Sequence, residues 1–377
     1  MKLIRISTVP VSLNVFCNGL FSELKEEGYD VVAVSSPGEA LDEIQSRENV
    51  EVFAVPMERH ISPLKDIKSL FKLVRVFRKV KPDMVHSITP KAGLLSMMAG
   101  WLCKVPIRLH TFTGLVFPTA SGLKQKILIF TDRLTCACAT HIVPEGEGVK
   151  RDLINYKITN KPLKVLGYGN IKGIDLNLFN PEDEEVKEKA ASLRKEGVFT
   201  FIFVGRLVRD KGINELIMAF SRLNQAFAES RLILVGNQES DLDPLLPEVL
   251  AEIDSNPAIE AVGHQADVRP WLAASDALVF PSYREGFPNV VIEAGAMGLT
   301  SIVTDINGSN EIIIEGKNGV IVPSKDEEAL FNAMKSFLEN PDMVKSMALQ
   351  ARSLISSRFE QSSVRKCLID YYKEISK

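Results

Sequence analysis

Short apolar runs alternate with longer amphipathic stretches along most of the chain. In the first half, these runs lie at residues 3–7, 31–35, 50–55, 84–87, 108–111 and 141–143. Between the first two, residues 16–28 have the apolar spacing of one helix that ends on a glycine. Buried strands that alternate with helices pair in parallel through right-handed crossovers. The pattern therefore predicts a Rossmann-like parallel sheet in the first half.

The same pattern begins again near residue 199. Apolar runs lie at residues 199–204, 231–235, 259–262, 277–280, 300–304 and 319–322, with a predicted helix at 213–227. The first three runs are followed directly by Gly205, Gly236 and Gly263. Two doubly wound α/β sheets in one chain are therefore expected.

The stretch between the two halves sets the expected domain boundary. Residues 162–181 are rich in Gly and Asn, and a charged run follows at 182–196. We place a hinge near Gly173, with a first domain of residues 1–172 and a second domain of residues 173–360. Residues 342–372 are predicted to be helical, and residues 361–377 are expected to pack back on the first domain.

Length, charge and cysteine content narrow the class of protein. The 377 residues exceed one ordinary core and favour two domains. A net charge of −3 excludes nucleic-acid binding by the whole surface, so any basic surface is local. Five cysteines without metal-ligand spacing are typical of reduced thiols in a cytoplasmic protein. The N-terminus does not have the pattern of a secretion signal, and the longest apolar stretch, residues 92–103, is too short to span a bilayer.

Two cations follow the first apolar run of the second half. Arg206 comes directly after Gly205, and Lys211 lies five residues further on, before Gly212. Ligands of open α/β sheets bind beyond the carboxyl ends of the strands, where glycine lets a phosphate approach the backbone. Both cations would neutralise charge on a departing diphosphate. Taken alone, these charges are better explained by an ordinary solvated loop, because charged loops are common.

A pair of carboxylates follows the run at residues 277–280. Residues 281–289 are predicted to form a strand-to-helix turn that holds Glu285, and the helix expected at 290–297 carries Glu293. Backbone N–H groups at a helix N-terminus bind phosphate or hydroxyl groups, and carboxylates accept hydrogen bonds from paired hydroxyls. Alternatively, Glu285 only interacts with the helix dipole and Glu293 is a surface residue. The apolar neighbours Ile292 and Ala294 favour a functional role for Glu293.

These motifs occur in the order and spacing of a known family. Glu285 and Glu293 match an E-x7-E pattern, and the flanking motifs are Val204-Gly205-Arg206-Leu207, Asp210-Lys211-Gly212, Val279-Phe280-Pro281-Ser282 and Glu285-Gly286-Phe287-Pro288. The chain resembles the retaining glycosyltransferases of family 4, which have the GT-B fold of two Rossmann-like domains with a cleft between them. The resemblance covers essentially the whole chain and is strongest in the second half.

The resemblance implies a role for each motif. Arg206 and Lys211 would bind the diphosphate of the donor, Glu293 its ribose, and Glu285 the transferred sugar. The remaining positions of the implied donor site are Gly205, Gly236, Gly286, Phe287, Pro288, Asn289 and Val290. His264 would border the base, and an ordinary surface histidine is an equal interpretation.

The first half is expected to bind the acceptor. Its first loop has no glycine, unlike many relatives, but Ser12 is available there for hydrogen bonds. Segments 86–93 and 111–115 resemble relatives that extend lipid-linked saccharides, which makes Lys91, Thr113 and Gly114 candidate acceptor residues. Lys91 would reach a lipid diphosphate, or is simply a lysine at a helix start. Many members of the family have a histidine near the transferred sugar, and either His110 or Thr113 is the equivalent residue here. Alternatively, His110 is a core residue.

A basic amphipathic helix is predicted at residues 63–80. Five cations recur at three- and four-residue spacing beside an apolar face, and the cations are Lys65, Lys68, Lys72, Arg75 and Lys79. Such a helix lies on the inner face of an anionic membrane, or it packs its apolar face on the sheet and leaves the lysines in water. Both interpretations remain open from the sequence.

The expected reaction moves a hexose or N-acetylhexosamine from a nucleoside diphosphate sugar, a UDP-sugar by preference, to a saccharide or polyprenyl-linked acceptor in bacterial polysaccharide assembly. The resemblance implies retention of configuration, and neither a metal nor another cofactor. The pair Asp241 and Asp243 has the spacing of a metal motif, but helix capping before Pro244 explains it better. A nucleotide-sugar epimerase of the same fold and a non-catalytic nucleotide-sugar sensor are the alternatives.

Overall fold

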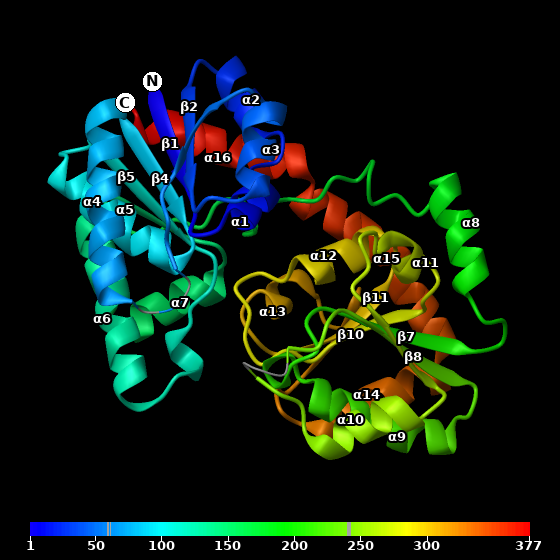
Figure 1. Ribbon diagram of the computed structural model, residues 1–377. Helices are drawn as coiled ribbons and strands as arrows, with labels where there is room; N and C mark the ends of the chain where they lie inside the picture. Colours follow the sequence, from blue (N-terminus) through cyan, green and yellow to red (C-terminus); the bar gives the residue numbers. More distant parts are fainter. Residues whose placement is uncertain (59, 61, 240–242) are drawn as a thin grey trace. The chain divides into compact units, whose positions relative to one another are not determined.

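The computed structural model describes residues 1–377 with the exception of residues 59, 61 and 240–242. The chain divides into two compact units, each with a parallel sheet covered by helices (Figure 1). Unit 1 comprises Met1–Gly173 and Ser362–Lys377, and unit 2 comprises Ile174–Gln361. These units confirm the expected α/β class. In the parts of the chain that the structure describes, no helix is both long and apolar enough to cross a bilayer.

Unit 1 is built on a six-stranded sheet of order β3-β2-β1-β4-β5-β6, in which every neighbouring pair is parallel. This is the order of a classical dinucleotide-binding sheet, and the direction in which the chain adds strands to the sheet reverses between β1 and β4. The strands are β1 (Lys2–Ile6), β2 (Asp30–Ser35), β3 (Glu51–Ala54), β4 (Met84–Ile88), β5 (Ile107–Phe112) and β6 (His141–Pro144).

Helices cover both faces of the unit 1 sheet. One apolar cluster joins it to α4 (Pro63–Val80), α5 (Pro90–Leu102), α6 (Gly122–Cys138) and α7 (Glu147–Asn155), with the short helix η1 (Phe117–Thr119) beside α6. A second cluster joins it to α1 (Pro10–Cys17), α2 (Leu20–Glu26), α3 (Glu39–Glu48) and α16 (Gln361–Ile375). The last helix of the chain therefore completes the core of the first unit, as Figure 1 shows for α16 in red.

Unit 2 repeats the architecture with a six-stranded sheet of order β12-β11-β10-β7-β8-β9. The strands are β7 (Phe199–Val204), β8 (Ser230–Val235), β9 (Ile259–Gly263), β10 (Ala277–Phe280), β11 (Thr300–Thr304) and β12 (Gly319–Val322). The helices are α8 (Glu184–Leu193), η2 (Arg209–Lys211), α9 (Ile213–Ala226), α10 (Pro247–Ser255), α11 (Arg269–Ala273), α12 (Asn289–Ala296), α13 (Ser309–Ile312), α14 (Glu327–Glu339) and α15 (Pro341–Phe359).

Two segments that were each predicted to form one helix form two helices instead. Residues 16–28 do not form one helix, because α1 ends at Cys17 and α2 begins at Leu20 after Gly19, whose φ is +74°. Residues 342–372 are likewise two helices, α15 and α16, that are separated at Glu360. At this break the carbonyl of Phe359 accepts the N–H of Ile174, which ties the break to the start of unit 2. In both places a tertiary contact overrides a continuous helical pattern.

Arg5 anchors the returning helix inside unit 1. Its guanidinium is buried, and Nη1 donates to the hydroxyl of Tyr372 in α16 at 2.8 Å. The same group contacts His86 of β4, and Nη2 lies 3.4 Å from Cys17 Sγ. Burial and the neighbouring arginine lower the pKa of His86, so the imidazole is neutral beside the fixed cation. Strand β1, strand β4 and the chain end are thus joined by one polar cluster.

Candidate active site

Two glycines lie close together at the carboxyl ends of β7 and β8. Gly205 follows β7 and Gly236 follows β8, and a Cβ atom on Gly236 would lie 1.9 Å from the carbonyl oxygen of Gly205. Gly236 also has a φ of +142°, which L side chains rarely adopt. Any larger residue would separate the two strand ends. Glycine therefore leaves the backbone here open to the close approach that phosphate binding requires.

Arg206 and Lys211 both lie beyond the carboxyl end of β7. Arg206 is half exposed, and its Nη1 donates to Oε2 of Glu239 at 2.7 Å. Lys211 is enclosed, with 17% of its side chain exposed, and its Nζ lies 5.2 Å from the centre of the Phe280 ring. The ammonium group forms an ion pair with the carboxylate of Glu285, of which 16% is exposed. Two of the expected site residues are thus in direct contact.

The turn after β10 holds Glu285 from a second side. The hydroxyl of Ser282 donates to Oε1 of Glu285 at 2.8 Å, the same oxygen that contacts Lys211. A cation and a hydroxyl therefore fix this carboxylate at the strand end. A carboxylate held in this way can accept a hydrogen bond from a ligand hydroxyl.

Contacts between the two loops keep Lys211 beside the turn. Arg284 pairs with Asp210 at 2.9 Å, and the N–H of Tyr283 donates to the carbonyl of Asp210 at 2.9 Å. A Cβ atom on Gly212, whose φ is +71°, would lie 2.1 Å from the carbonyl oxygen of Pro281. Sequence reasoning missed Asp210, Ser282 and Arg284 as site residues. The available signals were the positions of Asp210 and Ser282 inside two of the motifs, and that of Arg284 inside the predicted turn.

Tyr283 supports the loop from outside the site. Its hydroxyl donates to Oε1 of Glu215 in α9 at 2.5 Å. Burial, together with this hydrogen bond to a carboxylate, raises the pKa of Tyr283 above its usual range. The phenol therefore stays a hydrogen-bond donor at neutral pH and connects the turn to α9.

Helix α12 begins one residue earlier than expected, at Asn289. Pro288 precedes it and offers no side-chain oxygen to cap the helix. The turn residues Gly286 and Phe287 are packed under Gly308, where a Cβ atom would lie 2.5 Å from the carbonyl oxygen of Gly286. Glu293 is half buried one turn into α12, on the same face as Asn289. The helix start and both carboxylates thus lie at the carboxyl edge of this sheet.

The segments expected near the base are connected through their backbones. The N–H of Gly236 donates to the carbonyl of Gly263 at 2.8 Å, and the N–H of His264 donates to Oδ1 of Asn237 at 3.2 Å. His264 is exposed at this end of β9. The two loops therefore form one continuous border beside Gly205.

The possible metal motif at residues 241–243 lies partly outside the described residues, which include Asp243 but neither Asp241 nor Leu242. The expectation that this motif starts a helix is wrong for Asp243, because α10 begins at Pro247. Asp243 instead accepts the N–H of Asp210 at 2.6 Å and pairs with Arg209 at 3.2 Å. Among the residues with a described placement, no three His, Cys, Asp or Glu side chains gather as a metal site would need.

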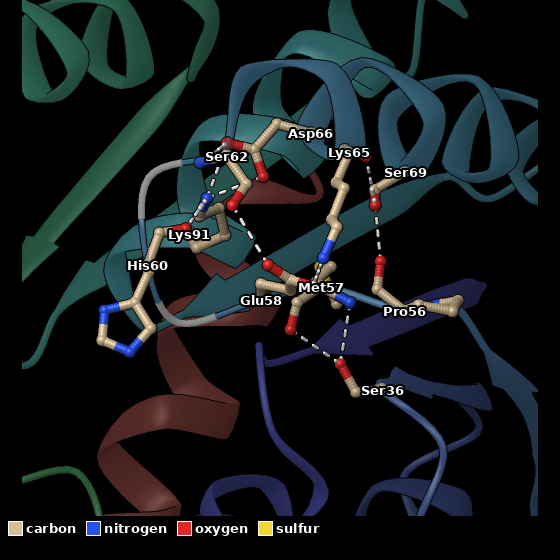
Figure 2. Close-up of polar contacts among 10 residues, drawn as sticks. All are labelled: Ser36, Pro56, Met57, Glu58, His60, Ser62, Lys65, Asp66, Ser69 and Lys91. Atoms are coloured by element: carbon tan, nitrogen blue, oxygen red, sulfur yellow. Dashed lines mark hydrogen bonds and ion pairs between the residues drawn. The ribbon is translucent and has the colours of Figure 1, made fainter.

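Lys91 of unit 1 is held in an intramolecular cluster (Figure 2). Its Nζ lies 2.6 Å from both carboxylate oxygens of Asp66 in α4 and 2.7 Å from the carbonyl oxygen of His60. Both charged side chains of the pair are largely enclosed. Lys65 in the same helix pairs with Glu58. This arrangement gives Lys91 a structural partner in the ligand-free chain.

The other candidates of unit 1 differ in their access to solvent. Ser12 in α1 is half buried, as are Thr113 and Gly114, which follow β5. His110 is buried inside the unit, where its Nδ1 lies 2.8 Å from Ser87 Oγ and its ring fills the space beside Gly93. Burial lowers the pKa of His110 to about 3, so the imidazole is neutral. Of the two candidates for the histidine position, Thr113 is therefore the accessible one.

Helix α4 spans the predicted bounds, and its apolar residues divide into two groups. Val74 and Phe77 are buried against the sheet, whereas Leu64, Ile67 and Phe71 are exposed. Packing on the sheet thus accounts for only part of the apolar face of this helix.

The sequence of the chain matches the models of known protein families. The family described as Glycosyl transferases group 1 matches residues 198–340, and the Glycosyl transferase 4-like domain matches residues 13–169. The chain is 29% identical over 377 residues to the capsular polysaccharide biosynthesis glycosyltransferase CapM of Staphylococcus aureus, with 100% of this chain and 98% of that protein covered.

Two further similarities agree with this assignment. The chain is 29% identical over 322 residues to the UDP-Gal:alpha-D-GlcNAc-diphosphoundecaprenol alpha-1,3-galactosyltransferase of Escherichia coli, with 83% of this chain and 81% of that protein covered. The crystal structure of Anabaena HepE in complex with UDP superimposes with a TM-score of 0.81 at 17% identity, covering 99% of this chain and 100% of that one. The chain has the GT-B fold and belongs to the group 1 glycosyltransferases, the retaining enzymes of family 4.

Proposed function

We propose that the protein transfers a hexose or N-acetylhexosamine from a UDP-sugar to a lipid-linked saccharide in bacterial polysaccharide assembly. The contact of Lys211 with Glu285 carries the proposal, because it brings a diphosphate-binding cation and a sugar-binding carboxylate together at the carboxyl edge of one sheet. The E. coli relative is named for transfer of Gal from UDP-Gal to a diphosphoundecaprenol-linked sugar, and HepE binds UDP. Both names support this choice of donor and acceptor.

In the proposed donor complex, Arg206 and Lys211 bind the diphosphate while Glu293 accepts hydrogen bonds from the ribose. Glu285 and the amides at the start of α12 hold the sugar, and the border made by Gly236, Gly263 and His264 receives the base. The bond from the anomeric carbon to the diphosphate breaks, and a bond to the acceptor oxygen forms on the same face. The acceptor proton passes to an oxygen of the leaving diphosphate. Arg206 and Lys211 stabilise the negative charge of this leaving group in place of a metal ion.

Acceptor binding is assigned to unit 1 in this proposal. Ser12, Thr113 and Gly114 lie at the ends of elements near the carboxyl edge of its sheet, where this fold binds ligands. Lys91 reaches a lipid diphosphate only if it leaves Asp66. The exposed cations Lys68 and Lys72 of α4 would attract an anionic membrane on the cytoplasmic side, which carries the lipid-linked acceptor.

A panel of nucleotide sugars tests the donor. The UDP-sugar that is the substrate should raise the melting temperature more than other nucleotide sugars do, because a ligand that binds only the folded state stabilises it. The same UDP-sugar should then be consumed only when a polyprenyl diphosphate saccharide is present. Conversion of the sugar to its epimer without acceptor would establish an epimerase instead. Tight binding without turnover on any lipid-linked acceptor would establish a sensor.

Substitution of Lys211 by Met tests the site itself. Removing one group that stabilises the leaving charge should lower the transfer rate by about 100-fold or more. Lys335→Met, which removes a surface lysine on α14, is the matched control and should leave the rate unchanged. Equal rates for the Lys211 variant and the wild type would place the diphosphate elsewhere.

A further inference from the structure

Two helices on one face of unit 1 carry exposed apolar stripes. In α4, Leu64, Ile67 and Phe71 recur at helical spacing, and Leu64 and Phe71 are 80% and 62% exposed. In α6, Leu123, Ile127 and Phe130 recur in the same way, and Leu123 and Phe130 are 73% and 64% exposed. Residues three and four apart share one face of a helix, so each set forms a continuous stripe.

Both stripes lie at the same edge of the sheet. Helix α4 follows β3 and helix α6 follows β5, and each stripe occupies the N-terminal half of its helix. Because the strands are parallel, these halves lie at the carboxyl edge. Helix α5 packs against both helices, and its own middle residues are buried. The two stripes therefore flank the beginning of α5 at the edge that the acceptor is proposed to use.

Cations border the apolar stripes. Residues 63–80 contain six Lys or Arg residues and one acidic residue, and residues 121–131 contain two lysines, Lys124 and Lys126, and no acidic residue. The one acidic residue, Asp66, is engaged by Lys91. Over the whole chain the balance is the reverse, with 45 basic and 48 acidic residues. This face is thus a local basic surface on a slightly acidic protein.

We infer that α4 and α6 form one membrane-binding surface, in which the α6 stripe inserts into the interfacial region of an anionic bilayer. Apolar residues with flanking lysines are typical of helices that lie in the plane of a membrane. A protein partner suits this surface less, because lysine is depleted at protein interfaces. The inference rests on the proposed function, since a lipid-linked acceptor brings the enzyme to a bilayer. It adds α6 as the inserting element, which attraction by the cations of α4 alone does not require.

Flotation with lipid vesicles tests the role of α6. The test variant combines Leu123→Ser, Ile127→Ser and Phe130→Ser, and the control combines Met218→Ser, Leu246→Ser and Leu349→Ser, which are exposed apolar positions of unit 2. The vesicles contain equal parts of phosphatidylcholine and phosphatidylglycerol, or phosphatidylcholine alone. The α6 variant should need about tenfold more anionic lipid for half-maximal binding, whereas the control should match the wild type. Any binding left in the α6 variant should disappear at high salt.

Two results would overturn the inference. The first is that the α6 variant and the wild type float equally well, or that neither floats with anionic vesicles. The second is that the substitutions change the sedimentation of the protein from dimer to monomer without affecting flotation, which would assign the stripe to a second copy of the chain. Stabilisation by UDP and transfer to a water-soluble acceptor analogue report on the proposed function separately. Both should be retained in the α6 variant, and their absence from the wild type would contradict the proposed function whatever the vesicles show.

Discussion

The ammonium group of Lys211 contacts the carboxylate of Glu285, although the two residues follow different strands of the unit 2 sheet. In the ligand-free chain, each charge therefore neutralises the other. A donor whose diphosphate binds Lys211 and whose sugar binds Glu285 would take over both roles. The pair holds the two side chains in place in the ligand-free chain, and under the proposed function it would compete with the donor for them.

Substitution of Glu285 by Gln separates these two effects. Removing the negative charge of Glu285 that lies beside Lys211 should raise the affinity for UDP several-fold, because the diphosphate no longer displaces a carboxylate. The same change should lower sugar transfer by about 100-fold. Calorimetric titration with UDP and initial transfer rates measure the two effects. Glu327→Gln, which changes a surface pair with Arg222, is the control and should change neither. Weaker UDP binding in the Glu285 variant would mean that this carboxylate contacts the nucleotide itself.

Substitution of Gly236 by Ala tests the close approach of the strand ends. The new methyl group would overlap the carbonyl oxygen of Gly205, so unit 2 should lose stability and UDP binding should disappear. Gly316→Ala is the matched control, because Gly316 has a φ of +72° with no atom within 4 Å of the added carbon. The control should cost only about 1 kcal/mol of unfolding free energy, from backbone strain. Urea unfolding measures both variants, and equal losses would show that strain alone matters at Gly236.

The buried His110 should make unit 1 sensitive to acid. Its folded-state pKa is about 3 and its unfolded value is near 6.5, so only the unfolded chain binds the proton between these values. Stability is therefore fully present above pH 6.5 and is lost as the pH falls toward 3. Between pH 6.5 and pH 5, the wild type should lose about 2 kcal/mol more unfolding free energy than His110→Gln. Hydrogen exchange of β5 amides reports the difference, and His264→Gln at an exposed site should behave as the wild type.

The pair of Lys91 and Asp66 should contribute to stability as a unit. Lys91→Met leaves an enclosed carboxylate without its main partner, and Asp66→Asn does the same to the ammonium group, so each should cost about 1–3 kcal/mol. The double variant should cost less than the sum, because neither charge is then stranded. Transfer rates with varied lipid-linked acceptor complete the test. An increase in KM for the acceptor in Lys91→Met, absent from Asp66→Asn, would favour a direct role of Lys91 in binding the lipid diphosphate.

The sheets could be predicted from the sequence because their signals are local. Four strands of unit 2, β7, β10, β11 and β12, have the bounds that their apolar runs indicated. The residues of β10 and β11 are buried throughout, and Gly205 and Pro281 directly follow β7 and β10, which makes such strands distinct from their surroundings. The turn before α12 also has a local signal, and the helix begins at Asn289, one residue before the predicted start.

The helix breaks could not be predicted, because distant residues cause them. At Gly19, the N–H donates to Oε1 of Glu48 in α3 at 2.7 Å, and Arg365 of α16 packs against the glycine. Nothing within residues 16–28 indicates these partners. The partners of the site cations are equally distant, since Glu239 contacts Arg206 from the loop after β8. Sequence patterns singled out Lys211 and Glu285 as candidates, and only the fold could show that the two meet.

The return of α16 to unit 1 has a consequence for the order of events during synthesis. Unit 2 is one continuous stretch, whereas unit 1 lacks the hydroxyl of Tyr372 and the apolar side chains of Leu368 and Ile369 until all of unit 2 has been synthesised. On the ribosome, the second unit can therefore reach its final state before the first. Until the last helix emerges, the guanidinium of Arg5 and the surface that α16 covers remain exposed to chaperones and proteases.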